Sequence, residues 1–101
     1  MLSDFADKGN RDAQEVLGAM YYFGIFVSKN YKSAFEWFLK AAENGSPYCQ
    51  EKIADMYYTN EFVKRNYKQA LEWYKKAASQ GDLYARLAAI ELEQMQLKGE
   101  F

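Results

Sequence analysis

The stretch NYKSAFEWFLKAAENG (Asn30 to Gly45) recurs as NYKQALEWYKKAASQG (Asn66 to Gly81). At an offset of 36 residues, identical residues stand at Asn30, Tyr31, Lys32, Ala34, Glu36, Trp37, Lys40, Ala41, Ala42 and Gly45. Self-similarity at a fixed period of this length is the sequence signature of a repeat architecture. Apolar residues within each copy follow the three- and four-residue spacing of one helix face, which predicts that the period is built from helices.

Working outward, the same offset pairs Gln14 with Gln50 and the triplet Met20 to Tyr22 with Met56 to Tyr58. The pattern predicts helices at about 11–23 and 47–59, followed by helices at about 31–44 and 67–80, with a further helix at 83–97. Three glycines suit left-handed helix ends, and each precedes a residue that can cap the next helix: Gly9 with Asn10, Gly45 with Ser46, and Gly81 with Asp82. Small residues at Gly18, Ala41, Ala54 and Ala77 predict close packing of the helices as antiparallel hairpins.

Composition limits the chemistry that the chain can offer. A length of 101 residues fits one domain, and a single proline without strand-like alternation predicts an all-α protein. The absence of histidine and the lone Cys49 exclude the usual zinc sites, a Cys/His dyad and an internal disulfide, so no metal or cofactor is expected. A net charge of −1 argues against a nucleic-acid partner, and no apolar run predicts a membrane span. If Met1 is the natural start, the expected location is cytoplasmic.

The motifs A-Q-x-x-L-G-x-M-Y-Y (Ala13 to Tyr22) and Y-K-x-A-x-E-W-F/Y-x-K-A-A-x-x-G together resemble the Sel1-like repeat family, relatives of tetratricopeptide repeats. This resemblance implies a right-handed superhelical α-solenoid of antiparallel helix hairpins that serves as a protein-binding scaffold. The expected single domain, 1–101, divides into a partial helix (1–9), two full repeats (10–45 and 46–81) and a C-terminal capping helix (82–101). Phe26 and Phe62 replace the second glycine of the family loop, and Asn60 replaces the first glycine in the second repeat.

The resemblance also implies that partners bind on the concave face, which the first helix of each repeat lines. Predicted partner-binding residues on that side are acidic or aromatic, with one leucine: Glu15, Tyr22, Tyr48, Glu51, Asp55, Tyr58, Tyr84, Leu87 and Glu91. Tyrosine supplies contact area and a polar tip, which favours an interface. The alternative is a solvated surface whose charges only follow helix propensity. Strict repetition of Trp37 and Trp73 indicates packing rather than a ligand site, and Cys49 is expected to be a buried apolar residue.

These observations predict a non-catalytic module that binds one partner protein with a basic surface, as a small inhibitor or immunity-type protein. The alternatives are a hydrolytic enzyme related to this family, or an adaptor or scaffold in bacterial signalling or host interaction. At both ends of the chain a large residue stands at a repeat position that is small elsewhere: Phe5 is equivalent to Ala41, and Ile90 is equivalent to Gly18. This indicates that no further helix packs against the first and last helices at these positions. Leu87, Ile90 and Met95 leave a second apolar face, which predicts a monomer or a weak homodimer through the C-terminal helix. Alternatively, residues 98–101 fold back over this face.

Overall fold

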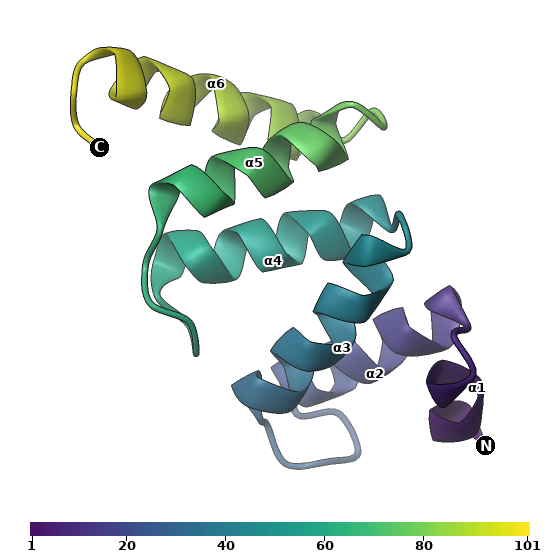
Figure 1. Cartoon of the computed structure of the whole chain (residues 1–101). Helices are drawn as coiled ribbons and strands as arrows, with labels where there is room; N and C mark the ends of the chain where they lie inside the picture. Colours follow the sequence, from purple (N-terminus) through teal and green to yellow (C-terminus); the bar gives the residue numbers. More distant parts are fainter.

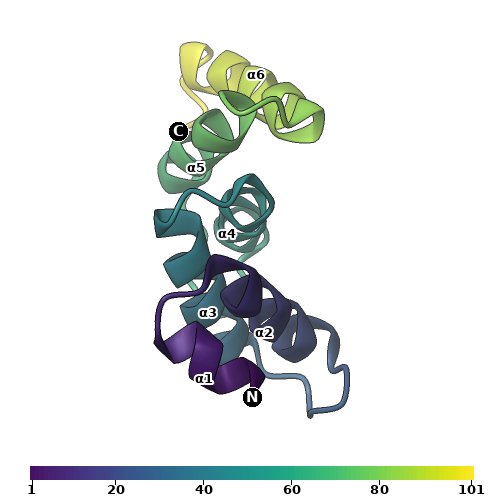
Figure 2. The ribbon, with the colours of Figure 1, turned by 90° about the vertical axis from the view of Figure 1, so that its right-hand side faces the viewer.

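The computed structural model describes all 101 residues as a row of six helices without strands. The helices are α1 (Leu2–Asp7), α2 (Arg11–Phe23), α3 (Tyr31–Glu43), α4 (Pro47–Thr59), α5 (Tyr67–Ala78) and α6 (Leu83–Leu97). Each helix packs chiefly against its neighbours in the chain, which gives an elongated body of 48 × 25 × 17 Å (Figure 1). In Figure 2, α1, α3 and α5 form one row and α2, α4 and α6 form the other. This is the predicted α-solenoid.

Side-chain caps and glycines place the helix boundaries. Asn10, Asn30, Ser46, Asn66 and Asp82 each accept a hydrogen bond from the third amide of the helix that follows, at 2.9 to 3.1 Å. Gly9, Gly45 and Gly81 have φ of 92°, 93° and 98°, a conformation that only glycine adopts without a steric cost. Because the chain turns at these glycines, α3 and α5 end at Glu43 and Ala78, slightly before the predicted ends.

The loops inside the repeats have the same backbone conformation in both copies. Gly24 and Asn60 lie in the left-handed region at φ of 71° and 65°, and Phe26 and Phe62 follow at 62° and 63°. The phenylalanines thus hold the conformation that the glycine they replace would adopt freely. Each loop then returns to its helix pair through a backbone bond, from the Asn30 amide to the Tyr21 carbonyl in the first repeat (2.8 Å).

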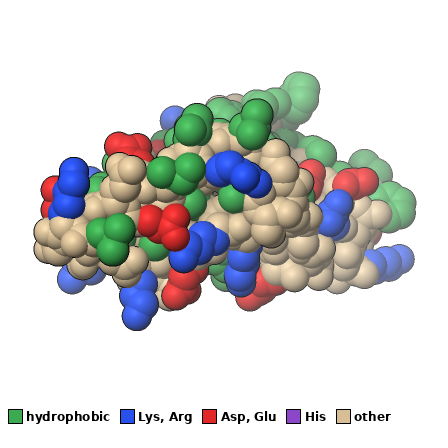
Figure 3. Space-filling view, turned by 90° about the horizontal axis from the view of Figure 1, so that it is seen from above, with side chains coloured by type: hydrophobic (Ala, Val, Ile, Leu, Met, Phe, Trp, Pro, Cys, Tyr) green, Lys and Arg blue, Asp and Glu red, His purple; other side chains and the backbone are tan.

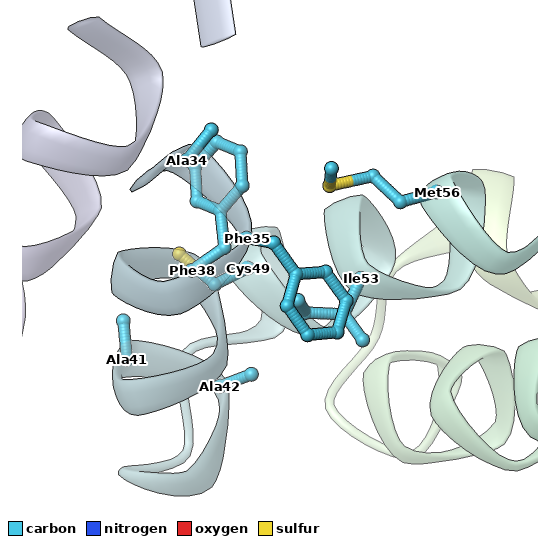
Figure 4. Packing of buried hydrophobic residues seen from close by; sticks show 8 residues of the cluster. All are labelled: Ala34, Phe35, Phe38, Ala41, Ala42, Cys49, Ile53 and Met56. Carbon is cyan, nitrogen blue, oxygen red and sulfur yellow. The ribbon is translucent and has the colours of Figure 1, made fainter. Parts of the chain in front are cut away.

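Small residues allow the helices of a hairpin to approach closely, as the sequence predicts. Ala34, Ala41, Ala54 and Ala77 are completely buried. A Cβ added to Gly18 would collide with the ring of Phe38, so the glycine makes room for that ring. Figure 4 shows Phe38 within the cluster between α3 and α4, which also contains Cys49, Ile53 and Met56. Close packing in the first hairpin therefore depends on the contact of Gly18 with the ring of Phe38.

Two equivalent glutamines join successive repeats. Gln14 donates from Nε2 to the carbonyl oxygen of Ala6 (3.1 Å), and Gln50 donates in the same way to Ala42 (3.2 Å). Both side chains are buried, so the bonds satisfy amide groups that would otherwise be desolvated without a partner. No helix is both long and apolar enough to cross a lipid bilayer.

Candidate functional site: a groove on α2, α4 and α6

A hollow of about 350 Å³ lies where alternate helices α2, α4 and α6 converge. Five of the predicted partner-binding residues line it: Tyr22 from α2, Asp55 and Tyr58 from α4, and Tyr84 and Glu91 from α6. The other lining residues are Thr59, Glu61, Tyr74 and Ala88. These nine residues define the groove. The two repeats and the C-terminal helix thus contribute side chains to one surface, which no single hairpin could form.

Hydrogen bonds from tyrosines hold two of the groove carboxylates. The hydroxyl of Tyr22 donates to both carboxylate oxygens of Glu61, at 2.9 and 3.1 Å. The hydroxyl of Tyr74, which reaches the groove from a buried ring on α5, donates to Asp55. Thr59 adds a hydrogen bond to Glu61 at 3.0 Å. The acidic groups are therefore held in position before any partner arrives.

Burial in this region disfavours ionisation. It raises the pKa of Asp55, although the hydrogen bond from Tyr74 opposes the shift. Burial, followed by the nearby carboxyl of Asp82, raises the pKa of Glu51 to about 7. The pKa values of the Tyr22 and Tyr74 hydroxyls are also raised, first by burial and then by the carboxylates to which they donate. Both hydroxyls consequently remain protonated donors near neutral pH.

Four of the predicted residues lie outside the groove. The half-buried Glu15 accepts a hydrogen bond from the hydroxyl of Ser46 and so joins α2 to the next repeat. Tyr48 packs its ring edge against Phe38, with centroids 6.1 Å apart. Glu51 lies beside Asp82 at the start of α6. Leu87 is 69% exposed and does not line the groove.

Sequence reasoning missed Glu61 and Tyr74, for different reasons. Glu61 follows α4 in a loop, and the prediction was restricted to helices. Tyr74 occupies the same repeat position as the apolar Phe38 and its ring is buried, but its hydroxyl extends to Asp55. A signal was available in the comparison of the repeats, because the positions equivalent to Asp55, Glu61 and Tyr74 are occupied by apolar side chains in the first repeat: Ala19, Ile25 and Phe38.

Comparison with known proteins agrees with this architecture. The Sel1 repeat family matches residues 11–46 and 47–82, most of the chain. The chain belongs to the Sel1 repeat family. These matched segments begin one residue after the repeats proposed above. Sel1 repeats typically serve as modules for protein–protein interaction, so the fold supports a binding role. No curated protein matches the chain.

Two solved structures are similar to this Sel1 repeat chain. One is a Sel1 repeat protein from Oxalobacter formigenes, with 38% identity over 83% of the chain and a TM-score of 0.78. The other is a protective antigen, present in uropathogenic Escherichia coli strains, that displays an SLR fold, with 33% identity over 80% of the chain and a TM-score of 0.77. The chain spans 34% and 17% of the lengths of these two proteins, respectively.

Most of the predicted second apolar face of this Sel1 repeat chain is exposed. On α6, Leu83, Leu87, Ile90 and Leu97 are 74%, 69%, 47% and 88% exposed and follow helical spacing, and we call them the α6 stripe. Seen from the α6 end, hydrophobic side chains lie among charged ones (Figure 3). Met95 differs from the prediction, because it packs against the cluster shared with α5. The chain end does not cover the stripe; Phe101 packs on Tyr67 instead, with centroids 5.6 Å apart.

The Sel1 repeat chain contains no group of three or more His, Cys, Asp or Glu side chains placed to hold a metal ion. Cys49 is completely buried, as predicted, and burial raises the pKa of its thiol to about 12. It therefore remains a protonated thiol near neutral pH and is a poor nucleophile. The repeated tryptophans pack against the core from the other row, Trp37 beside Ala13 and Leu17 and Trp73 between the two larger clusters. Lys40 and Lys76 lie over their rings, with Nζ 4.6 and 4.3 Å from the ring centroids.

Proposed function

We propose that this chain is a non-catalytic module that binds one partner protein through the groove on α2, α4 and α6. The observation that carries this proposal is the convergence of tyrosines and carboxylates from both repeats and the C-terminal helix on one hollow of about 350 Å³. Tyrosine is enriched in binding hot spots because it combines a large contact area with a polar tip and few rotatable bonds. Three carboxylates in the same lining favour a partner with a basic surface.

The size of the chain favours a single partner. Its accessible surface is 6123 Å², and the whole body measures 48 × 25 × 17 Å. A standard protein interface covers roughly 800 Å² on each side, and the row that would supply it consists of only three helices, α2, α4 and α6. We therefore favour a small inhibitor or immunity-type protein, which blocks one site on its partner, over an adaptor that must hold two proteins at once.

We also propose weak self-association of two copies through the α6 stripe. Four large apolar side chains with exposures of 47% to 88% lie on one helix face, and no segment of the chain covers them. Contiguous exposed apolar surface of this kind commonly marks an interface. A stripe of one helix buries less area than an obligate dimer requires, so the expected association is weak.

Site-specific cross-linking tests the groove proposal. A photoreactive phenylalanine analogue replaces Tyr84, which is 55% exposed at the groove, and in matched variants replaces Lys32 or Lys68 on the opposite row. After irradiation in cells of the source organism, we expect one protein to be linked from position 84 and to be absent from positions 32 and 68. Cross-links to one protein from position 32 or 68, but not from position 84, would place the interface on the other row and overturn the proposal.

A further inference from the structure

The lining of the groove is acidic without a compensating cation. Asp55, Glu61 and Glu91 are its charged members, and neither lysine nor arginine contributes to it. The two ion pairs of the structure lie elsewhere: the Met1 amino group with Asp4, and Lys75 with Glu93. The groove thus has room for a positive group and the charges to hold it.

Lys52 is the cation that acts on Asp55, but its ammonium group lies over aromatic rings and not on a groove carboxylate. Its Nζ lies over the rings of Tyr48, Tyr22 and Phe23, 5.4, 5.8 and 5.9 Å from their centroids. It forms an ion pair with none of the groove carboxylates. Lys52 moderates the negative potential, and the pKa of Asp55 remains raised, mainly by burial. A cation that entered the groove would therefore stabilise the ionised carboxylates.

The acidic lining is not a requirement of the repeat. Position for position, Asp55, Glu61 and Tyr74 replace Ala19, Ile25 and Phe38 of the first repeat, which folds into the same hairpin with the same loop conformation. Packing alone would accept apolar residues at all three positions. The second repeat instead places a half-buried carboxylate beside a tyrosine hydroxyl, an arrangement that costs desolvation and needs another reason.

We propose that the groove receives the guanidinium group of an arginine side chain presented by the partner. This inference rests on the proposed function of the groove as a partner-binding site. A guanidinium is planar, remains charged at all relevant pH values and carries five N–H donors, so it can bond to more than one carboxylate at once. Its faces also stack on aromatic rings, and Tyr84, which is 55% exposed, supplies such a ring in the groove.

Lysine satisfies this site less well than arginine. Its ammonium group is a compact point charge that is strongly hydrated, whereas the groove offers separated carboxylates between ring faces. The carboxylates also keep free acceptor capacity, because Asp55 is hydrogen-bonded to the hydroxyls of Tyr74 and Tyr84, while an ionised carboxylate can accept about four such bonds. Arginine can use that capacity at Asp55, and Glu91 from α6 adds a second carboxylate to the same lining.

Three short peptides that differ at one position test this inference by NMR titration of the isotope-labelled chain. The peptides carry arginine, lysine or citrulline, which keeps the shape of arginine and lacks its charge. We expect the arginine peptide to shift the amide signals of Thr59, Glu61 and Glu91, the lysine peptide to bind more weakly, and the citrulline peptide to bind roughly tenfold more weakly or not at all. Asp55→Asn or Glu91→Gln should weaken arginine binding by roughly tenfold. Glu72→Gln, an exposed change on α5, should leave it unaltered.

The outcomes separate this inference from the proposed function. Equal binding of arginine and citrulline peptides, or arginine-induced shifts confined to α3 and α5, would overturn the arginine site. Glu91→Gln should not affect folding, because Glu91 is exposed and its replacement leaves the core unchanged. The loss of arginine binding in this variant can therefore be attributed to the groove. Groove cross-links at position 84 without arginine binding would retain the partner surface and overturn the arginine site alone. Arginine binding in the groove combined with cross-links from positions 32 and 68 would support the arginine site and overturn the proposed partner surface.

Discussion

The hydroxyl of Tyr74 on α5 donates a hydrogen bond to the carboxylate of Asp55 on α4, where the preceding repeat has Phe38 and Ala19. The two repeats share one backbone plan and differ in chemistry at this contact. At the equivalent positions of the first repeat both side chains are apolar. In the second, a tyrosine with a buried ring presents its polar tip to the groove.

Replacing this polar pair by its counterpart from the first repeat tests the comparison. Tyr74→Phe removes the donor and leaves the half-buried carboxylate of Asp55 without its partner, which should cost about 1 to 2 kcal/mol of unfolding free energy. The double variant Asp55→Ala with Tyr74→Phe should recover most of that loss, because both polar groups are then absent. Urea denaturation measures both. A double variant less stable than Tyr74→Phe would contradict this interpretation.

The left-handed phenylalanines of the loops provide a second, matched test. At Phe26 the ring is 96% exposed, so Phe26→Gly relieves backbone strain without losing a contact. Phe62 packs on Phe35, with centroids 5.6 Å apart, and Phe62→Gly loses that contact. We expect the Phe26 variant to be the more stable of the two by about 1 kcal/mol. Thermal melting of the two variants provides the measurement. A lower melting temperature for Phe26→Gly than for Phe62→Gly would show that the Phe26 ring contributes to stability.

The raised pKa of Glu51 predicts a pH dependence of stability. Folding raises this pKa from 4.5 to about 7, so the folded chain binds the proton more tightly than the unfolded chain. The stabilising contribution is therefore complete below pH 4.5 and is lost as the pH rises through about 7. Burial is the main cause of the raised pKa, Asp82 and Asp55 raise it further, and Lys52 acts to lower it.

Glu51→Gln isolates this effect, because the amide cannot ionise. We expect the melting temperature of the wild type to fall relative to that of the variant between pH 4.5 and 7. Melting curves of both proteins in buffers across this range provide the measurement. A difference between the two proteins that stays constant over the range would mean that Glu51 ionises normally in the folded chain.

Self-association through the α6 stripe is tested by Ile90→Glu. This change places a charge in the centre of the stripe, where Ile90 is 47% exposed, so helical content should be retained while the dimer dissociates. Gln69→Glu adds the same charge on exposed α5 and serves as the control. Sedimentation at several concentrations should show a weaker dimer for the first variant only. A wild type that sediments as a monomer at high concentration would exclude the homodimer.

The fold could be predicted because its signals are local and repeated. The bounds of α2 and α4 agree with the prediction, since Asn10 and Ser46 cap their starts and left-handed Gly24 and Asn60 end them. The end of α5 was harder to predict, because Ser79 and Gln80 are compatible with either a helix or a turn and the outcome depends on Gly81.

The groove could be predicted only in part, because it depends on three helices far apart in sequence. Helical spacing placed Tyr22, Asp55 and Tyr84 on related faces, but it could not show that Glu61 turns back from its loop to the hydroxyl of Tyr22. Glu15 is the opposite case, a residue that was predicted to bind a partner but lies outside the groove. Its spacing suits the inner face, yet its carboxylate is engaged by Ser46 at the junction of the repeats, which only the three-dimensional contact reveals.

The most direct test of the account is the affinity of the cross-linked partner for two charge-reversed variants at one fixed salt concentration. Glu51→Lys with Asp55→Lys reverses charge in the groove at Asp55 and on the same helix, outside the groove, at Glu51. Lys32→Glu with Lys68→Glu reverses charge on the opposite row. Circular dichroism verifies that both variants keep their helices. We predict that the groove variant binds at least roughly tenfold more weakly and that the other binds like the wild type. Unchanged binding by the groove variant, with binding lost in the Lys32 and Lys68 variant, would contradict the account.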